Sequence, residues 1–368
     1  MATNSLAELL FDTGADASTT LLHVGDRAYD RAELKAAAER SATAISARGV
    51  GAGDCVAVLA PNSAATIASY FGVWAAGATL VTVNPRLTDT EITAMLDTVR
   101  PAAVIEADAT GTLDAAVGAG VAAPAAVDAA TAVVSFTSGT TGAPKPVLLR
   151  HDRVLAALDA VLTTLSRRET AGARQMRPNI VAFPLAMWSG VYTICFSFRV
   201  GAALVVMERF DPAELVQLAR THDVRSVVLA PAMLTALLHC DAIADLGPLR
   251  FVRNGTAALP VPVAQAFHDR FGVPVLNGYG QTELGGEVVG WSAADVREFG
   301  DAKIGSVGRP HAGVDLRVDD GELLVRSPFA MAGHLDDGAT AARVTADGYL
   351  RTGDLAEIDA DGFVWIVG

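Results

Sequence analysis

The residues best suited to chemistry lie together between positions 137 and 145. Six consecutive residues are threonine, serine or glycine, and a lysine follows three positions later. Glycine lets a backbone approach a ligand closely, while hydroxyls, successive N–H groups and an ammonium group can donate hydrogen bonds to an anion. We therefore predict a phosphate-binding loop that consists of Thr137, Ser138, Gly139, Thr140, Thr141, Gly142 and Lys145.

A flexible linker with a solvated lysine is the alternative interpretation of this run. Two features of the sequence favour the phosphate loop. The run follows directly on the apolar residues 132–136, which predict a short buried strand. Lys145 is also one of only three lysines among 28 basic residues. The spacing is not that of a GxxxxGKS/T nucleotide loop, which occurs nowhere in the chain.

A second candidate site is the segment 277–283, with the sequence NGYGQTE, directly after the strand-like residues 273–276. Ligands bind at the carboxyl ends of strands in open α/β sheets. Tyr279 offers a flat face for a purine, Thr282 a hydroxyl for a phosphate and Glu283 a hard oxygen for Mg²⁺. From the residues alone, an ordinary strand-to-helix turn with a capping glutamate explains the segment equally well.

The run TSGTTGAPK at residues 137–145 resembles the phosphate-loop signature of the adenylate-forming enzymes. This superfamily contains acyl- and aryl-CoA synthetases, luciferases and nonribosomal-peptide adenylation domains. The resemblance extends from about residue 21 to residue 368. It implies that Tyr279 stacks on the adenine, that Thr282 contacts the α-phosphate and that Glu283 holds the metal.

Two further segments share this resemblance. RTGDL at 351–355 matches a motif whose aspartate, here Asp354, accepts hydrogen bonds from both ribose hydroxyls. NGTAALP at 254–260 is similar to the segment that lines the adenine and the acyl pocket. Beyond the phosphate loop, the resemblance thus implies a nucleotide site of Gly255, Thr256, Ala257, Asn277, Gly278, Tyr279, Gly280, Thr282 and Asp354.

The segment 183–192, FPLAMWSGVY, resembles one wall of the acid-binding pocket in this superfamily. Many acyl-CoA synthetases have a histidine where this chain has Met187, and no aspartate is present to hold an α-ammonium group. An α-amino acid is therefore disfavoured as substrate, although a Met–Trp pair is also ordinary core packing. A second departure is Pro146, where the superfamily usually has glycine. The expected pocket residues are Met187, Trp188, Tyr192, Gly278 and Leu284.

Composition restricts the partners and the compartment. The net charge of −13 argues against nucleic acid and anionic membranes as partners. The three widely spaced cysteines show no metal-binding pattern and indicate a reducing compartment. The N-terminus lacks a signal-peptide pattern, and the uncharged stretch 180–198 is interrupted by Pro184 and Gly190. We expect a cytoplasmic protein without integral membrane association; a homodimer is compatible with the sequence.

Hydrophobic periodicity predicts an α/β protein. Unbroken apolar runs at 55–60, 79–83 and 102–107 alternate with helix-like segments, and similar runs follow after residue 179. After about residue 300 short alternating strands dominate. We expect two doubly wound, mostly parallel αβ subdomains at 1–175 and 176–295 and a small antiparallel β-barrel subdomain at 296–368. Residues 108–131 show no period and are expected to form a surface connection.

The resemblance predicts the large N-terminal domain of an AMP-forming acyl- or aryl-CoA synthetase, a ligase of the kind found in fatty acid metabolism. ATP and Mg²⁺ would be bound, with CoA as co-substrate and a carboxylic acid as substrate. Thr282, Glu283 and Lys145 are the expected catalytic residues. The superfamily's C-terminal catalytic-lysine domain would begin just after Gly368, so we expect slow adenylation and poor thiol transfer. A carrier-protein-loading enzyme and a nucleotide-binding module without turnover are the alternatives.

Overall fold

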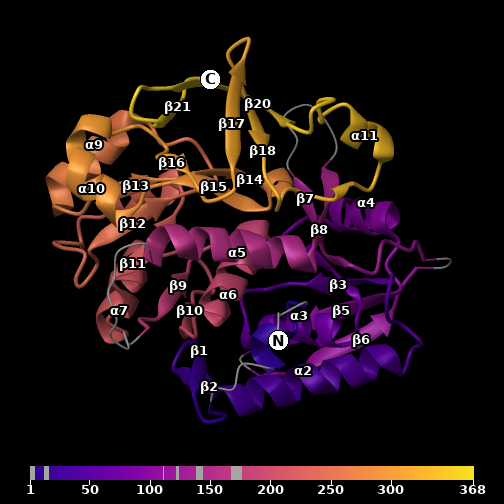
Figure 1. Ribbon diagram of the computed structural model, residues 1–368. Coiled ribbons are helices and arrows are strands. Elements are labelled where there is room, and N and C mark those ends of the chain that lie inside the picture. Colours follow the sequence, from indigo (N-terminus) through magenta and orange to yellow (C-terminus); the bar gives the residue numbers. More distant parts are fainter. Residues whose placement is uncertain (1–4, 12–15, 111, 122–123, 138–143, 167–175) are drawn as a thin grey trace. The chain divides into compact units, whose positions relative to one another are not determined.

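The computed structural model describes residues 5–11, 16–110, 112–121, 124–137, 144–166 and 176–368 (Figure 1). The chain packs as two compact units. Unit 1 consists of Met1–Leu155, Phe183–Arg209 and Met331–Leu335. Unit 2 consists of Ala156–Ala182, Phe210–Ala330 and Asp336–Gly368. The expected division of the chain into three subdomains, with boundaries at residues 175 and 295, stays a prediction.

Unit 1 is built on a seven-stranded sheet with the order β19-β8-β7-β4-β3-β5-β6. Its centre is parallel, because β7, β4, β3 and β5 all run in the same direction. The other three strands are antiparallel to their neighbours. The strands are β3 (Cys55–Leu59), β4 (Thr79–Val83), β5 (Ala103–Ala107), β6 (Ala115–Ala119), β7 (Thr131–Thr137), β8 (Lys145–Arg150) and β19 (Gly333–His334).

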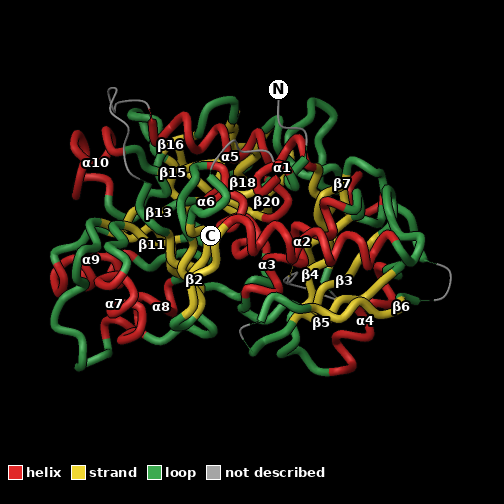
Figure 2. The backbone as a smooth tube through the Cα atoms, turned by 90° about the horizontal axis from the view of Figure 1, so that it is seen from below, coloured by secondary structure: helices red, strands yellow, loops and turns green. Residues whose placement is uncertain are grey.

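Helices cover both faces of this sheet (Figure 2). On one face lies α3 (Ala64–Ala75), whose first eleven residues are all buried, and α2 (Arg31–Ser46) packs against it. A Cβ atom on Gly72 would come within 2.5 Å of the Ser41 Cβ, so glycine permits this close helix packing. On the other face, α4 (Asp89–Val99) packs against buried valines of β4 and β7. The predicted doubly wound parallel arrangement is therefore confirmed for unit 1.

Two predictions in this unit were wrong. The segment 108–131 is more than a connection, because it contains β6, which pairs antiparallel with β5 at the sheet edge. The apolar run at 202–207 forms β10 (Leu204–Val206), which pairs with β1 (Thr20–Val24) and does not join the later parallel sheet. Local periodicity identifies a strand but not its partner. Unit 1 also contains α1 (Glu8–Phe11), β2 (Arg27–Asp30) and α6 (Trp188–Arg199).

Unit 2 contains the second parallel sheet, with the order β11-β12-β13. Its strands are β11 (Ser226–Leu229), β12 (Phe251–Asn254) and β13 (Val275–Asn277), and its helices are α7 (Pro212–Thr221), α8 (Pro231–Leu238) and α9 (Val261–Phe271). Helix α7 begins at a local signal in the sequence: Asp211 accepts a hydrogen bond from the Glu214 N–H, and Pro212 is the first helical residue. Strand β9 (Asn179–Val181) precedes this sheet in the chain, and α5 (His151–Ser166) runs across the boundary at residue 155.

The rest of unit 2 is largely antiparallel, as the sequence predicts. One sheet has the order β14-β15-β16 and another β17-β18-β20-β21. The turn between β17 and β18 has positive φ at both Asp320 (51°) and Gly321 (82°), as an Asp-Gly hairpin requires. The elements are β14 (Tyr279–Gln281), η1 (Thr282–Leu284), β15 (Gly286–Gly290), α10 (Ala293–Phe299), η2 (Gly300–Lys303), β16 (Arg309–Pro310), β17 (Asp315–Asp319), β18 (Glu322–Arg326), α11 (Asp337–Ala341), β20 (Leu350–Ile358) and β21 (Val364–Ile366).

The uncharged stretch 180–198 forms the end of β9, a turn and most of α6, as predicted. Across the described residues, no helix has both the length and the apolar composition that a membrane crossing needs. The three cysteines are free thiols; Cys55 and Cys195 are buried and Cys240 is half-buried.

Candidate functional site

In unit 1, the predicted phosphate loop connects two antiparallel strands. Strand β7 ends at Thr137, β8 begins at Lys145, and these two residues are paired in register. The Thr137 hydroxyl donates to the Lys145 carbonyl at 3.4 Å, and the Lys145 side chain is exposed. Ser138, Gly139, Thr140, Thr141 and Gly142 lie outside the described residues. The ends of the loop are thus fixed by a sheet, and the lysine is available to a ligand.

Pro146 is the second residue of β8 and pairs with Phe136 of β7. A proline cannot donate to a strand ladder, but its carbonyl still accepts a hydrogen bond from Leu335 N–H at 3.0 Å. Pro146 is therefore accommodated between two strands of the sheet.

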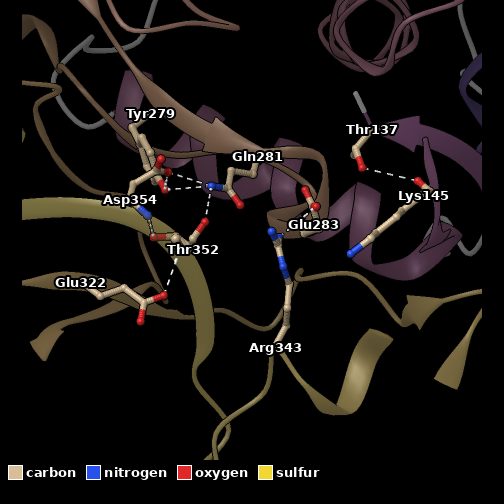
Figure 3. A network of polar contacts seen from close by, with 10 residues as sticks. Thr137, Lys145, Tyr279, Gln281, Glu283, Glu322, Arg343, Thr352 and Asp354 are labelled. Atoms are coloured by element: carbon tan, nitrogen blue, oxygen red, sulfur yellow. Dashed lines mark hydrogen bonds and ion pairs between the residues drawn. The ribbon is translucent and has the colours of Figure 1, made fainter. Parts of the chain in front are cut away.

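In unit 2, two side chains converge on one carboxylate oxygen (Figure 3). The Tyr279 hydroxyl donates to Asp354 Oδ2 at 2.6 Å, and the Gln281 amide donates to the same oxygen at 2.7 Å. Gln281 also donates to the Thr352 carbonyl at 3.0 Å. Burial raises the pKa of Tyr279, and the bond to Asp354 raises it further, so the phenol stays protonated and remains a donor.

The backbone around Asp354 is held in place where β20 shifts its register against β18. The Thr352 hydroxyl donates to the Leu323 carbonyl at 2.7 Å and accepts from Asp354 N–H at 3.1 Å. Gly353 has a φ of 78° and donates its N–H to Glu322 at 3.0 Å. Within the described part of the chain, Oδ1 of Asp354 has no hydrogen-bond partner. The site therefore presents an oriented carboxylate with an unused acceptor oxygen.

Glu283 lies in the short 3₁₀ turn η1 that follows β14. Its side chain is buried, and its Oε1 accepts a hydrogen bond from Arg343 Nη1 at 3.0 Å (Figure 3). Gly285 ends this turn with a φ of 79°, and a Cβ atom there would collide with the Phe329 carbonyl oxygen. Only glycine fits both requirements. The direction of the Glu283 carboxylate is therefore set by backbone geometry.

Glycines shape the segment between β13 and β14. A Cβ atom on Gly280 would collide with the carbonyl of Gly286, which lies on the neighbouring strand β15. A Cβ atom on Gly278 would lie 2.9 Å from Glu287 Oε2. We expected a strand-to-helix turn here as the alternative to a ligand site, but the chain enters an antiparallel strand. Its glycines are required for that close strand approach.

The segment 254–257 is tied to the start of the same motif. The Asn254 side chain donates to Asn277 Oδ1 at 2.6 Å and to the Ala257 carbonyl at 3.2 Å. These bonds join the carboxyl ends of β12 and β13. Thr256 has a φ of 72°, which is an unusual conformation for a β-branched residue and is found preferentially at functional sites. Gly255 and Ala257 flank it.

Residues 14–335 match the family described as "AMP-binding enzyme". The chain belongs to this family. It is 31% identical to a 7a-methyl-1,5-dioxo-octahydro-1H-inden-4-yl-propanoyl:CoA ligase of Mycobacterium tuberculosis, over 93% of this chain and 74% of that protein. It is 30% identical to a feruloyl-CoA synthase of an Amycolatopsis species, over 95% of this chain and 75% of that protein. Its fold is similar to that of ATP-bound MatB from Rhodopseudomonas palustris, with a TM-score of 0.85, 22% identity, and 99% and 78% of the two chains covered.

The predicted family, α/β fold class and enzyme class of the chain are thus confirmed. This AMP-binding enzyme has an α/β fold similar to that of MatB. The two relatives named above are a CoA ligase and a feruloyl-CoA synthase. The assignment of individual site residues stays a prediction.

The predicted acid-pocket residues of this AMP-binding enzyme belong to both units. In unit 1, Met187 precedes α6 and is 45% exposed, whereas Trp188 is buried and its ring lies edge-on to Tyr192, with centroids 5.9 Å apart. In unit 2, Leu284 is completely buried, and Gly278 contacts Glu287. Met187 is therefore the most accessible of these side chains.

Sequence reasoning missed two polar residues next to the expected ones. Gln281 follows Tyr279 by two positions on β14, and residues two apart on a strand share a face, so its contact with Asp354 could have been anticipated. Arg343 lies 60 positions from Glu283 in a segment without a recognisable motif. Only the tertiary structure brings it to Glu283.

A third polar cluster lies next to this motif. Glu287 Oε1 accepts from Arg253 Nη2 at 2.5 Å and from His311 Nε2 at 3.0 Å. The other His311 nitrogen is 3.1 Å from the Thr164 hydroxyl. Burial opposes ionisation of Glu287, but Arg253 and His311 outweigh it and hold its pKa below the usual value. This cluster links β12, β15 and α5, and its Glu287 lies next to Gly278.

Proposed function

We propose that the chain binds ATP and a carboxylic acid and joins them as an acyl-adenylate with release of pyrophosphate. In this proposal the chain acts as the adenylating domain of an acid–CoA ligase. The acid's carboxylate oxygen attacks the α-phosphorus, and the bond from that phosphorus to the pyrophosphate oxygen breaks. CoA thiol then displaces AMP to give the thioester. The named relatives that act on acids and CoA support this choice of acceptor.

The single observation that carries the proposal is the environment of Asp354. Two neutral donors, Tyr279 and Gln281, orient its Oδ2 without neutralising the negative charge. Paired hydroxyls of a ribose are natural partners for such a carboxylate. In this proposal Asp354 binds the ribose, the Tyr279 ring stacks on adenine, and Asn277, Gly278, Gly255, Thr256 and Ala257 line the base.

In this proposal the phosphates of ATP are bound by an ammonium group and by hydroxyl groups. Lys145 and the hydroxyl-rich residues 137–142 supply donors in unit 1, and Thr282 supplies a hydroxyl in unit 2. Phosphoryl and adenylyl transfer require little covalent work from a protein, so charge stabilisation dominates. On a chain with a net charge of −13, these local donors must attract the nucleotide.

Glu283 fits the requirements of a Mg²⁺ ligand. Mg²⁺ prefers hard oxygen ligands and is usually bound by one or two carboxylates together with substrate phosphates and waters. Among the described residues, Glu283 Oε2 has no hydrogen-bond partner and Oε1 is held by Arg343. A bound Mg²⁺ would neutralise charge on the phosphates of ATP. Glu283 would orient it, and Thr282 would contact the adjacent phosphate.

Acid-dependent exchange of labelled pyrophosphate into ATP tests this function directly. A panel of aryl, fatty and amino acids should show exchange with some aryl or fatty acids and little with amino acids. The Glu283→Gln variant should lose about 10²- to 10³-fold of the exchange rate, as is usual when one charge-stabilising group is removed. Exchange that needs no acid, or full exchange by Glu283→Gln, would contradict the proposal. Glu298, which is exposed on α10, provides the matched control Glu298→Gln.

Binding can be tested separately from turnover. A non-hydrolysable acyl-sulfamoyl adenosine mimics the proposed intermediate, so it should bind more tightly than AMP to the isolated chain. Calorimetric titration with one aryl and one fatty analogue measures this difference. A chain that binds neither analogue nor ATP is not an adenylating domain.

A further inference from the structure

The carboxylate of Glu283 already has a cationic partner within unit 2. Arg343 Nη1 lies 3.0 Å from Glu283 Oε1, and the two residues are 60 positions apart in the sequence. The Glu283 side chain is only 9% exposed, whereas the Arg343 side chain is 35% exposed. The carboxylate is therefore fixed in the protein, and its guanidinium partner reaches it from the surface.

The backbone of Arg343 is held by two hydrogen bonds, whereas its guanidinium makes few. Its N–H donates to the Thr340 carbonyl at 3.0 Å, and its carbonyl accepts from Arg351 N–H on β20 at 2.8 Å. Among the described residues, Glu283 is the one side-chain partner of its guanidinium. A guanidinium has five N–H donors. Most of the donors of Arg343 are thus available to a ligand.

A divalent cation on Glu283 would compete with Arg343. One carboxylate balances a single positive charge, so binding of a cation leaves the guanidinium without its counter-charge and close to a like charge. The triphosphate of a nucleotide provides the missing negative oxygens. The planar guanidinium fork matches phosphate oxygens in geometry and charge.

We propose that Arg343 is a phosphate-binding residue of this chain. It holds Glu283 while no nucleotide is bound, and it donates to β- or γ-phosphate oxygens when ATP is bound. The inference rests on the proposed function, because it requires ATP to bind beside Glu283. AMP has only the α-phosphate, so Arg343 contributes to the binding of ATP and not to that of AMP.

Calorimetric titration of ATP and AMP, each with Mg²⁺ present, tests this selectivity. Arg343→Met removes the charge and keeps a long side chain, and it should weaken ATP binding by about tenfold to a hundredfold, the usual effect of losing hydrogen bonds to a charged group. AMP binding should stay within about twofold of the original value, which also shows that the variant is folded. Arg343→Lys should recover part of the ATP affinity, because lysine can pair with phosphate as a point charge.

Arg326→Met is the matched control. Arg326 also bonds one carboxylate, Asp315, at 2.6 Å, and its side chain is 52% exposed on β18. It lies outside the proposed nucleotide site, so neither ATP nor AMP affinity should change.

The competition for Glu283 has its own test without nucleotide. Mn²⁺, which electron paramagnetic resonance detects directly, should bind Arg343→Met several-fold more tightly than the original chain. The double variant Arg343→Met/Glu283→Gln should lose this gain, because the carboxylate that Mn²⁺ uses is gone.

The outcomes separate the two proposals. If Arg343→Met binds ATP as the original chain does, or loses ATP and AMP affinity equally, Arg343 is not a triphosphate ligand. Equal Mn²⁺ affinity in both proteins would show that Arg343 does not compete for Glu283. If the original chain binds no adenine nucleotide at all, the proposed function itself fails.

Discussion

Unit 2 contains two glutamate–arginine pairs whose glutamates are four residues apart, and their surroundings differ. Glu287 accepts from both Arg253 and His311, and the Arg253 side chain is only 14% exposed. In the part of the chain that the structure describes, Glu283 accepts from Arg343 alone, whose side chain is 35% exposed. The first carboxylate is shared by two cationic or polar partners from separate elements. The second has one partner at the surface.

This difference separates a structural pair from an exchangeable one. Breaking a buried pair leaves an uncompensated charge, so such a pair persists once the chain has folded. A partly exposed guanidinium can leave its partner at lower cost, because water solvates the guanidinium once it is free. Ion pairing alone therefore does not mark a functional site. The number of partners and the exposure of the cation distinguish Glu283 from Glu287.

The largest expected effect comes from breaking the Glu287 pair. Arg253→Met leaves the Glu287 carboxylate, which is 24% exposed, with His311 as its remaining partner, and we expect a loss of roughly 1.5–3 kcal/mol in the free energy of unfolding. Arg343→Met should cost less than Arg253→Met, because the Arg343 guanidinium is partly exposed and makes a single hydrogen bond to its carboxylate. Urea titrations of both variants, followed by circular dichroism, measure the difference.

Equal losses in the two variants would remove the distinction between the pairs. The double variant Arg253→Met/Glu287→Leu serves as a control for the unpaired charge. It replaces the pair by apolar groups and should recover part of the stability lost in Arg253→Met.

A smaller effect is expected at the third carboxylate, Asp354, which has neutral donors in place of a cation. Asp354→Asn keeps the shape of the side chain but removes its charge, and should weaken ATP binding by roughly ten- to a hundredfold through weaker bonds to the ribose. Stability should change little, because no buried cation loses its partner. Calorimetry with ATP and 2′-deoxy-ATP measures the effect.

The two nucleotides provide the internal control. The original chain should prefer ATP to 2′-deoxy-ATP, and Asp354→Asn should show a much smaller preference. An undiminished preference would assign ribose recognition to another residue.

The sequence allowed the strands, helix starts and site motifs to be predicted wherever the signal was local. The capping box of α4, with Thr88 and Glu91, and the Asp211 cap of α7 each depend on residues three apart, so the sequence alone indicates them. The turn at Asp320 and Gly321 is equally local. These features need no knowledge of the rest of the chain.

Long-range pairing could not be predicted in the same way. Strand β10 is apolar, as most of β11 is, yet it pairs with β1, in which Leu22 lies 182 residues before its partner Leu204. The partners of Glu283 and Glu287, Arg343 and His311, are distant in sequence and lie outside any motif. Charged residues are common on surfaces, so nothing local distinguishes these two. Resemblance to a family identified Glu283, but only the structure identified its arginine.

The smallest expected effect is the acid dependence of the Glu287 cluster. Because Arg253 and His311 hold the folded-state pKa of Glu287 below its unfolded value, the charged cluster stabilises the fold above the usual glutamate pKa. That contribution should disappear as the pH falls from about 5 through the folded-state pKa, where the carboxylate takes up a proton.

Glu287→Gln carries no titrating group at this position, so its free energy of unfolding should fall less steeply below pH about 5, even though the variant is less stable at pH 7. Urea midpoints measured between pH 3 and 7 at constant ionic strength reveal the slope. If both proteins lose stability with the same slope, the charge of Glu287 does not contribute to folding, and the contrast with Glu283 would depend on packing alone.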